Sequence, residues 1–212
     1  MRQESVFFPC GELNLNGDCY YPDKIGNFPA VVLCHPHPLN GGSMSSSVIR
    51  ALGKALVERS IVAFMFNFRG VGKSQGSYNN GIGEQGDTIA ALDWIESQSL
   101  IDKEKIGLAG YSFGGGVAAS VASRDIRVKT IALISPYLEP VAYNQLEDCY
   151  IPKYFITGGD DNLILPETVE TIYKASSEPK RFEIVPGIDH FWFGFEESLA
   201  HKVEDFLSEV LT

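Results

Sequence analysis

The feature that most constrains this chain is a series of short, uninterrupted apolar runs, each followed by a segment of helical periodicity. Strands buried on both faces are apolar throughout, whereas half-exposed strands alternate. The runs therefore predict the central strands of a parallel sheet. They are Ala30–Cys34, Ile61–Phe66, Lys105–Ala109, Lys129–Ile134 and Tyr154–Thr157, with Arg181–Val185 as one more.

Apolar residues recur at helical spacing between these runs. The recurring sets are Val48, Leu52 and Leu56; Ile89, Leu92 and Ile95; and Leu199, Val203, Phe206 and Val210. Pro166 suits the first turn of a further helix. The start of the chain differs, because Ser5–Phe8 and Leu13–Tyr21 predict a hairpin or meander with Asn16-Gly17 as its candidate turn. Alternating strands and helices predict an α/β fold, an open and mostly parallel sheet with helices on both faces.

Composition narrows the classes of function. No linker or repeat interrupts the 212 residues, so we expect a single domain over residues 1–212. The net charge of −10 argues against nucleic acid and against anionic membranes as partners. Apolar runs such as Ile61–Phe66 are too short to cross a bilayer, and Met1–Leu13 lacks the pattern of a secretory signal. Four cysteines without C-x-x-C spacing predict reduced thiols in a cytoplasmic protein.

In such sheets the ligand site lies at the carboxyl ends of the strands. The pentapeptide Gly110-Tyr111-Ser112-Phe113-Gly114 is a G-x-S-x-G motif between the strand Lys105–Ala109 and the small-residue helical stretch Gly115–Ser123. A strand-to-helix turn would hold Ser112 in a strained backbone conformation. We expect side chains at Gly110 and Gly114 to collide across the turn, and the helix N-terminus with the Phe113 N–H to face a bound group.

A second G-x-S-x-G match, residues 72–76, places Ser74 before a loop. Without a following helix, Ser74 is disfavoured as a nucleophile. The segment Gly70–Ser74 also imitates a phosphate loop, but Asn67 stands where the first glycine of that motif belongs. Nucleotide binding is therefore the weaker interpretation.

A serine nucleophile needs a base, and the base needs an orienting carboxylate. His190 follows the last predicted strand at the correct sheet edge, whereas His201 lies in the C-terminal helix on its expected wet face. Asp161, or else its neighbour Asp160, follows the strand Tyr154–Thr157. An aspartate here could instead cap the next helix. The chain order Ser112, Asp161, His190 is that of the α/β-hydrolase elbow enzymes.

An oxyanion hole needs two N–H donors. One is the Phe113 amide, and the other belongs in the loop that begins at His35. Prolines donate nothing, which leaves His37 as the best-placed donor. His35-x-His37 could also share a metal, but no nearby acid completes the ligand set, and we expect no metal.

Together these residues resemble the α/β-hydrolases, specifically the small lidless group related to dienelactone-hydrolase-like esterases. The matching segments are Cys34-His35-Pro36-His37-Pro38 with Gly41-Gly42, Asn67 to Ser74, Gly110 to Gly115, Gly158-x-x-Asp161-x-x-Ile164 and Gly187-x-Asp189-His190-Phe191. The resemblance implies an α/β-hydrolase fold of about eight strands. It also implies Ser112, Asp161 and His190 as catalytic triad, and the His37 and Phe113 amides as oxyanion hole. Dienelactone hydrolases proper have cysteine at the elbow, where this chain has Ser112.

Many relatives insert a cap domain after the sixth strand, and residues 135–151 are too few for one. The resemblance therefore implies a site open to solvent, without a cap. Its candidate substrate-binding walls are Tyr78, Tyr137, Phe191 and Trp192.

The expected function is a serine hydrolase that cleaves carboxylic esters, small or short-chain ones, through an acyl-enzyme and without a cofactor. Its partner would be a small-molecule ester. The sequence also allows a homodimer. Thioesters, lactones or small amides are alternative substrates for the same triad. A non-catalytic α/β-hydrolase-fold binding protein, and a metal or nucleotide enzyme, are the alternatives of another class.

Overall fold

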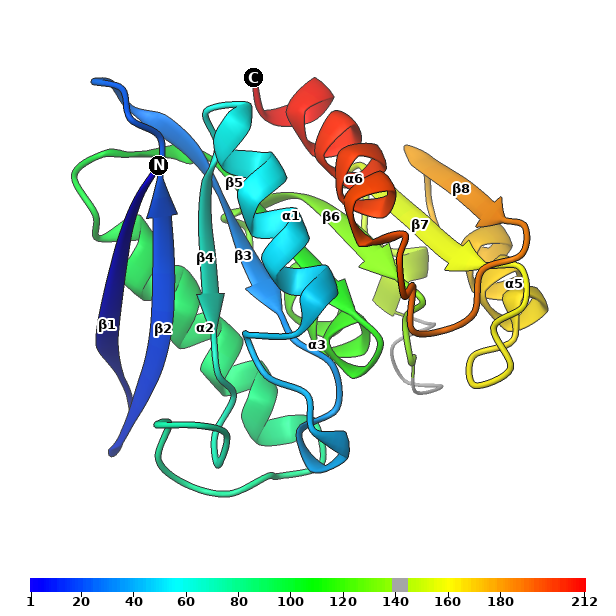
Figure 1. The fold of residues 1–212 in the computed structure, drawn as a ribbon, viewed down its shortest axis with the longest axis horizontal. Helices are drawn as coiled ribbons and strands as arrows, with labels where there is room; N and C mark the ends of the chain where they lie inside the picture. The colour runs from blue at the N-terminus through cyan, green and yellow to red at the C-terminus, as the bar shows by residue number, and fades with distance from the viewer. Residues whose placement is uncertain (139–144) are drawn as a thin grey trace.

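The structure, a computed structural model, describes residues 1–138 and 145–212. Its centre is one eight-stranded sheet in the order β1-β2-β4-β3-β5-β6-β7-β8 (Figure 1). The pairs β1–β2 and β2–β4 are antiparallel, and all pairs from β4 to β8 are parallel. The mostly parallel sheet predicted from the apolar runs is thus confirmed. The strands are β1 (Arg2–Cys10), β2 (Leu13–Tyr21), β3 (Phe28–Cys34), β4 (Val62–Phe66), β5 (Ile101–Tyr111), β6 (Val128–Ile134), β7 (Lys153–Gly158) and β8 (Lys180–Val185).

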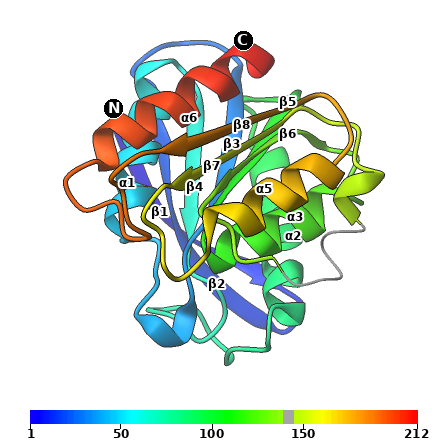
Figure 2. The same ribbon diagram turned by 90° about the vertical axis from the view of Figure 1, so that its right-hand side faces the viewer.

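Helices cover both faces of the sheet, as predicted. One face carries α1 (Ser47–Glu58) and α6 (Glu196–Leu211). The other face carries α2 (Ile82–Glu96), α3 (Phe113–Ala122) and α5 (Pro166–Ala175), and Figure 2 shows the two layers from the side. A short 3-10 helix, η1 (Pro38–Asn40), follows β3. None of the described helices combines the length and apolarity needed to span a bilayer.

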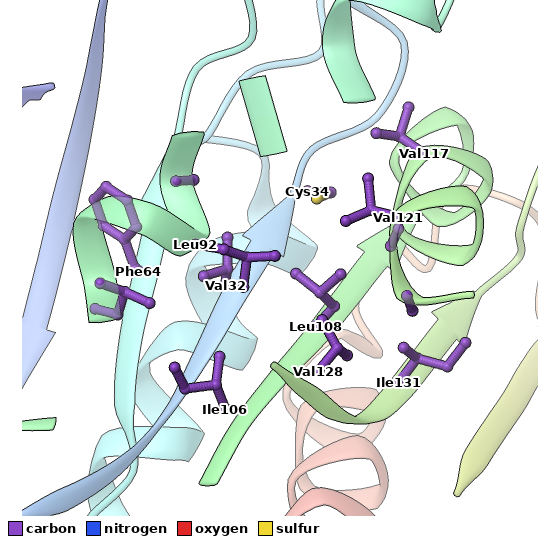
Figure 3. Close-up of a cluster of buried hydrophobic side chains, with 14 of the residues drawn as sticks. Val32, Cys34, Phe64, Leu92, Ile106, Leu108, Val117, Val121, Val128 and Ile131 are labelled. Carbon is purple, nitrogen blue, oxygen red and sulfur yellow. The ribbon is translucent and has the colours of Figure 1, made fainter. Parts of the chain in front are cut away.

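The continuous apolar runs are explained by cores on both faces of the central strands. Val32 of β3 and Leu108 of β5 pack against Leu92 of α2 and Val121 of α3 (Figure 3). The opposite side chains of the same strands belong to a second core with α1 and α6. This two-sided burial leaves the strand ends as the part of the sheet that can form a site.

One local prediction was wrong. Asn16-Gly17 is not the hairpin turn but lies within β2, where Gly17 pairs with Val6 on one side and Phe66 on the other. The hairpin turns at Gly11, whose φ is 59°. Gly17 is required by packing, because a Cβ there would lie 2.7 Å from the Phe64 ring. A dipeptide typical of turns was overridden by strand pairing on both sides.

Candidate active site

Ser112 joins β5 to α3 in a strained conformation, with φ 56° and ψ −120°. A non-glycine residue in such a region is destabilised by about 1–3 kcal/mol and needs support from its surroundings. The Ser112 N–H donates to the Ile134 carbonyl (2.9 Å), and its carbonyl accepts from the N–H groups of Gly115 and Tyr137 (2.9 Å each). These bonds confirm the predicted turn and hold it from both sides.

Two glycines allow this turn, for different reasons. A Cβ on Gly110 would lie 2.2 Å from the Gly114 carbonyl oxygen, the collision across the turn that the sequence predicted. A Cβ on Gly114 would instead meet the carbonyl oxygens of Cys34 (2.2 Å) and His35 (2.5 Å). Gly114 therefore lets the end of β3 approach the start of α3, which brings the loop after β3 beside Ser112.

His190 comes from the loop after β8 and reaches Ser112. Its Nε2 lies 2.9 Å from the Ser112 Oγ, and its Nδ1 lies 2.8 Å from an Asp161 carboxylate oxygen. Because a carboxylate only accepts, Nδ1 donates, and Nε2 of the neutral ring is left to accept the serine proton. The Tyr111 hydroxyl donates to the His190 carbonyl at 2.7 Å and holds this loop in place.

The Asp161 carboxylate is 1% exposed and fully engaged. One oxygen pairs with His190, and the other accepts the N–H groups of Leu163 (3.0 Å) and Ile164 (2.8 Å). Burial raises the pKa of Asp161, but the hydrogen bonds from His190 and the two amides outweigh burial and leave the pKa below its ordinary value. Asp161 therefore stays ionised and can orient the imidazole.

The neighbouring alternative is placed elsewhere. Asp160 is exposed, and its N–H donates to the Ile188 carbonyl at 2.9 Å. The structure thus brings Asp161, and not Asp160, to His190. Neither aspartate precedes α5 directly, since Leu165 holds that position, so the cap interpretation was wrong for both.

The two residues expected to supply oxyanion amides line the same cavity as Ser112. Phe113 is the first residue of α3, and the first amides of a helix have no intrahelical acceptor. His37 precedes η1, and its ring lies 4.9 Å from the Phe113 ring. The His37 Nδ1 accepts the Leu39 N–H at 3.2 Å, which fixes the imidazole. Their use as an oxyanion hole stays a prediction.

A cavity of about 1070 Å³ opens above Ser112. Tyr78, Tyr137 and Phe191 line it, as expected, but Trp192 does not. The Trp192 side chain is 1% exposed, packs in the core beside α6, and donates its indole N–H to Ser135 Oγ at 3.2 Å. Phe193, missed from the sequence, takes its place in the cavity wall.

The second serine motif has a structural role. Ser74 is buried; its Oγ accepts the Asn16 N–H (3.0 Å) and donates to the Asn67 carbonyl (2.6 Å). Those bonds tie the loop after β4 to β2. A Cβ on Gly72 would lie 2.5 Å from the Asn67 amide nitrogen, so this glycine is explained by packing as well.

The hydrogen bonds of His35 are made within the protein. Its Nδ1 donates to the Pro36 carbonyl (2.6 Å), and its Nε2 accepts the Phe68 N–H (3.0 Å). Burial lowers the pKa of His35 to about 4, so the ring is neutral. With both nitrogens engaged, His35 has no lone pair for a metal. The described part of the chain contains no cluster of three side chains placed to hold one.

Two supporting residues escaped sequence reasoning. Tyr111 is a variable position of the G-x-S-x-G motif, and nothing in the sequence signals its bond to His190. Arg69, which follows β4, forms an ion pair of 2.7 Å with the buried Asp87 of α2. Its guanidinium packs where a side chain on Gly83 would stand, 2.4 Å from that Cβ position. No pattern in the sequence around Arg69 predicts that it pairs with Asp87.

A mostly parallel eight-stranded sheet, covered by helices and carrying a serine on a strained turn between β5 and α3, defines an α/β-hydrolase. The family model described as X-Pro dipeptidyl-peptidase (S15 family) matches residues 11–160, and the chain belongs to this family. An uncharacterized protein of Rickettsia prowazekii is 30% identical over 189 residues, covering 85% of this chain and 79% of that protein.

Two solved structures agree with this assignment. An alpha-beta serine hydrolase homologue from Coxiella burnetii is 34% identical, with a TM-score of 0.87 over 100% of this chain and 99% of that chain. A serine hydrolase without lid from Xanthomonas campestris is 25% identical, with a TM-score of 0.85 over 100% of this chain and 96% of that chain. The protein is accordingly a member of the α/β serine hydrolases, and the part of the chain that the structure describes contains no cap domain.

Proposed function

We propose that this protein hydrolyses carboxylic esters through a catalytic triad of Ser112, His190 and Asp161. The observation that carries the proposal is the pair of hydrogen bonds, 2.9 Å and 2.8 Å, that links the three side chains in the cavity. A serine hydroxyl is a weak nucleophile unless a base takes its proton during attack. His190, oriented by a buried carboxylate, has its Nε2 within hydrogen-bond distance of the hydroxyl and can act as that base.

The reaction would proceed in two halves. His190 Nε2 takes the proton of Ser112 as Oγ attacks the ester carbonyl, and the amides of His37 and Phe113 hold the oxyanion. The imidazolium then protonates the departing alcohol and leaves an acyl-enzyme. Water activated by His190 releases the acid and restores the serine. The chain's own side chains and backbone amides, together with water, supply every group in this scheme.

Esters fit the cavity better than peptides do. The family description names a dipeptidyl-peptidase, and an enzyme of that kind must bind a peptide's N-terminal ammonium. None of the described residues that line the cavity is an aspartate or glutamate. A buried or half-buried ammonium without a paired carboxylate would be strongly disfavoured. Thioesters, lactones and small neutral amides need the same machinery as esters and are tested by the same variants.

A purely binding protein is the less favoured alternative. The strained conformation of Ser112 is destabilising, and Ser112 is oriented toward a histidine that is itself oriented by an ionised carboxylate. Catalysis explains that arrangement, whereas binding alone does not require it. The small or short-chain acyl group expected for a lidless site is part of the proposal.

The direct test is Ser112→Ala, assayed with p-nitrophenyl acetate. We expect kcat to fall by at least about 10³-fold with an unchanged circular dichroism spectrum. Ser74→Ala, in the second motif, is the matched control. It should lose some stability, because the Asn16 N–H loses its acceptor, and yet keep its turnover. Wild-type turnover by the Ser112 variant would contradict the proposal.

A further inference from the structure

Two exposed aromatic rings directly follow His190 in the cavity wall. Phe191 and Phe193 stack with ring centroids 5.7 Å apart and an interplanar angle of 15°, and they are 47% and 71% exposed. Trp192 between them is buried and bonded to Ser135, so the segment is anchored while its neighbours face the cavity. Aromatic faces held together in water mark a place where an apolar partner binds.

The chemistry of the triad determines which part of an ester reaches this place. In the proposed reaction the His190 imidazolium must give its proton to the leaving oxygen, so that oxygen lies within hydrogen-bond distance of Nε2. The alcohol portion of the substrate therefore extends from the His190 side of Ser112. The Phe191 ring meets the His190 ring edge to face, with the ring centroids 5.7 Å apart, and lines the cavity beside it.

The oxyanion residues lie on the other side of the serine. In the sheet, β3 lies on one side of β5, and the loop that follows β3 contains His37. On the other side of β5 lie β6, β7 and then β8, and the loop that follows β8 contains His190. Ser112 at the end of β5 is thus between the two loops. The carbonyl oxygen points toward the β3 loop, and the alcohol toward the β8 loop with its stacked rings.

The described wall of the cavity offers no ion partner to a charged alcohol. Although the chain carries 17 basic and 27 acidic residues, none of the described lining residues is lysine, arginine, aspartate or glutamate. The β8 side of the wall is continued by the apolar side chains Leu163 and Ile164. A charged alcohol would therefore gain no ion pair with the described wall, whereas a neutral aromatic alcohol can stack on the two rings.

We infer that the leaving alcohol is a neutral aromatic group that packs on the Phe191–Phe193 pair, so that this enzyme is selective for aryl or arylalkyl esters of short acids. The inference rests on the proposed ester hydrolysis and adds its specificity. Phe193 is then a specificity-determining residue that acts on the leaving group and leaves the acyl group unaffected.

The test compares esters that share an acetyl group and differ in the alcohol. For Phe193→Ala, we expect kcat/KM for 2-naphthyl acetate to fall about ten-fold, because an aromatic contact on the leaving group is lost before the acyl-enzyme forms. For ethyl acetate, the kcat/KM of the variant divided by that of the wild type should stay near one. Phe193→Tyr keeps the aromatic face and should retain wild-type values for both esters. Phe195→Ala, an exposed aromatic residue that does not line the cavity, is the matched control and should change neither.

Ethyl 2-naphthoate, which has the aromatic ring on the acid, tests whether the stacked pair binds the acyl group instead of the alcohol. If Phe193→Ala slows this ester and spares 2-naphthyl acetate, the stacked pair binds the acyl group and the inference is overturned. Equal effects on naphthyl and ethyl acetates also overturn it. Ser112-dependent turnover of ethyl acetate by the wild type keeps the proposed function standing in either case. If no ester shows Ser112-dependent turnover, the proposed function and the inference fall together.

Discussion

His35 should make the folded protein lose stability below neutral pH. In the fold its ring is neutral, because burial lowers the pKa from 6.5 to about 4, while its Nε2 accepts the Phe68 N–H. In the unfolded chain the ring takes up a proton near its ordinary pKa. The unfolded state therefore binds more protons below pH 6.5, and the stabilising effect of the neutral ring, complete above that pH, is lost as pH falls toward 4.

The size of the effect follows from the two pKa values. Between the unfolded pKa of 6.5 and the folded pKa of about 4, each pH unit changes the free energy of unfolding by about 1.4 kcal/mol. A fall from pH 7 to pH 5 crosses about one and a half units of this range. We expect His35 to contribute a loss of about 2 kcal/mol in the free energy of unfolding over that interval.

The measurement is urea unfolding of wild type and His35→Gln at pH 7 and pH 5. The variant lacks the titration, so the stability difference between the two proteins should shrink by about 2 kcal/mol at the lower pH. All other groups are common to the two proteins and cancel in the difference. His201→Gln, whose side chain is 62% exposed, is the control and should keep the wild-type pH dependence. A stability difference that is the same at both pH values would refute the reasoning.

Three further predictions test how the site is assembled. Asp161→Asn should lower kcat by about 10⁴-fold because the His190 tautomer is no longer held, whereas Asp160→Asn should be mild; steady-state kinetics would place the acid at Asp160 if the order were reversed. His37→Ala should have a small effect on kcat, since only its amide is used, and a loss as deep as that of His190→Ala would point to side-chain chemistry. Gly114→Ala should destabilise by at least about 2 kcal/mol in thermal or urea unfolding, because its Cβ would lie 2.2 Å from the Cys34 carbonyl oxygen; a neutral result would mean that β3 can move away from α3.

The fold and the core of the site were predictable because their signals are local and obligatory. A strand segment buried on both faces must be apolar, as are β4 and residues 30–34 of β3, 106–109 of β5 and 131–134 of β6. A serine on a strand-to-helix turn requires glycine beside it, and parallel strands bring their carboxyl ends to one edge. Those constraints predict that Ser112, Asp161 and His190 lie near one another.

The remaining features depend on contacts that no local pattern records. Trp192 was expected in the cavity wall, but it has φ 58°, its side chain is buried in the core, and Phe193 lines the cavity instead. Gly17 carries a turn signal, and strand pairing on both sides overrides it. Gly114 was expected to clear Gly110, but its close neighbours are the carbonyls at the end of β3, which are distant in sequence.

The central claim is that the Ser112 hydroxyl is activated by His190, and covalent labelling tests it most directly. A serine-directed fluorophosphonate followed by peptide mapping should find one modified residue, Ser112, in the wild-type protein. Labelling should disappear in Ser112→Ala and slow by orders of magnitude in His190→Ala. An adduct on Ser74 or another serine, or a labelling rate that is unchanged when the imidazole is removed, would contradict the account.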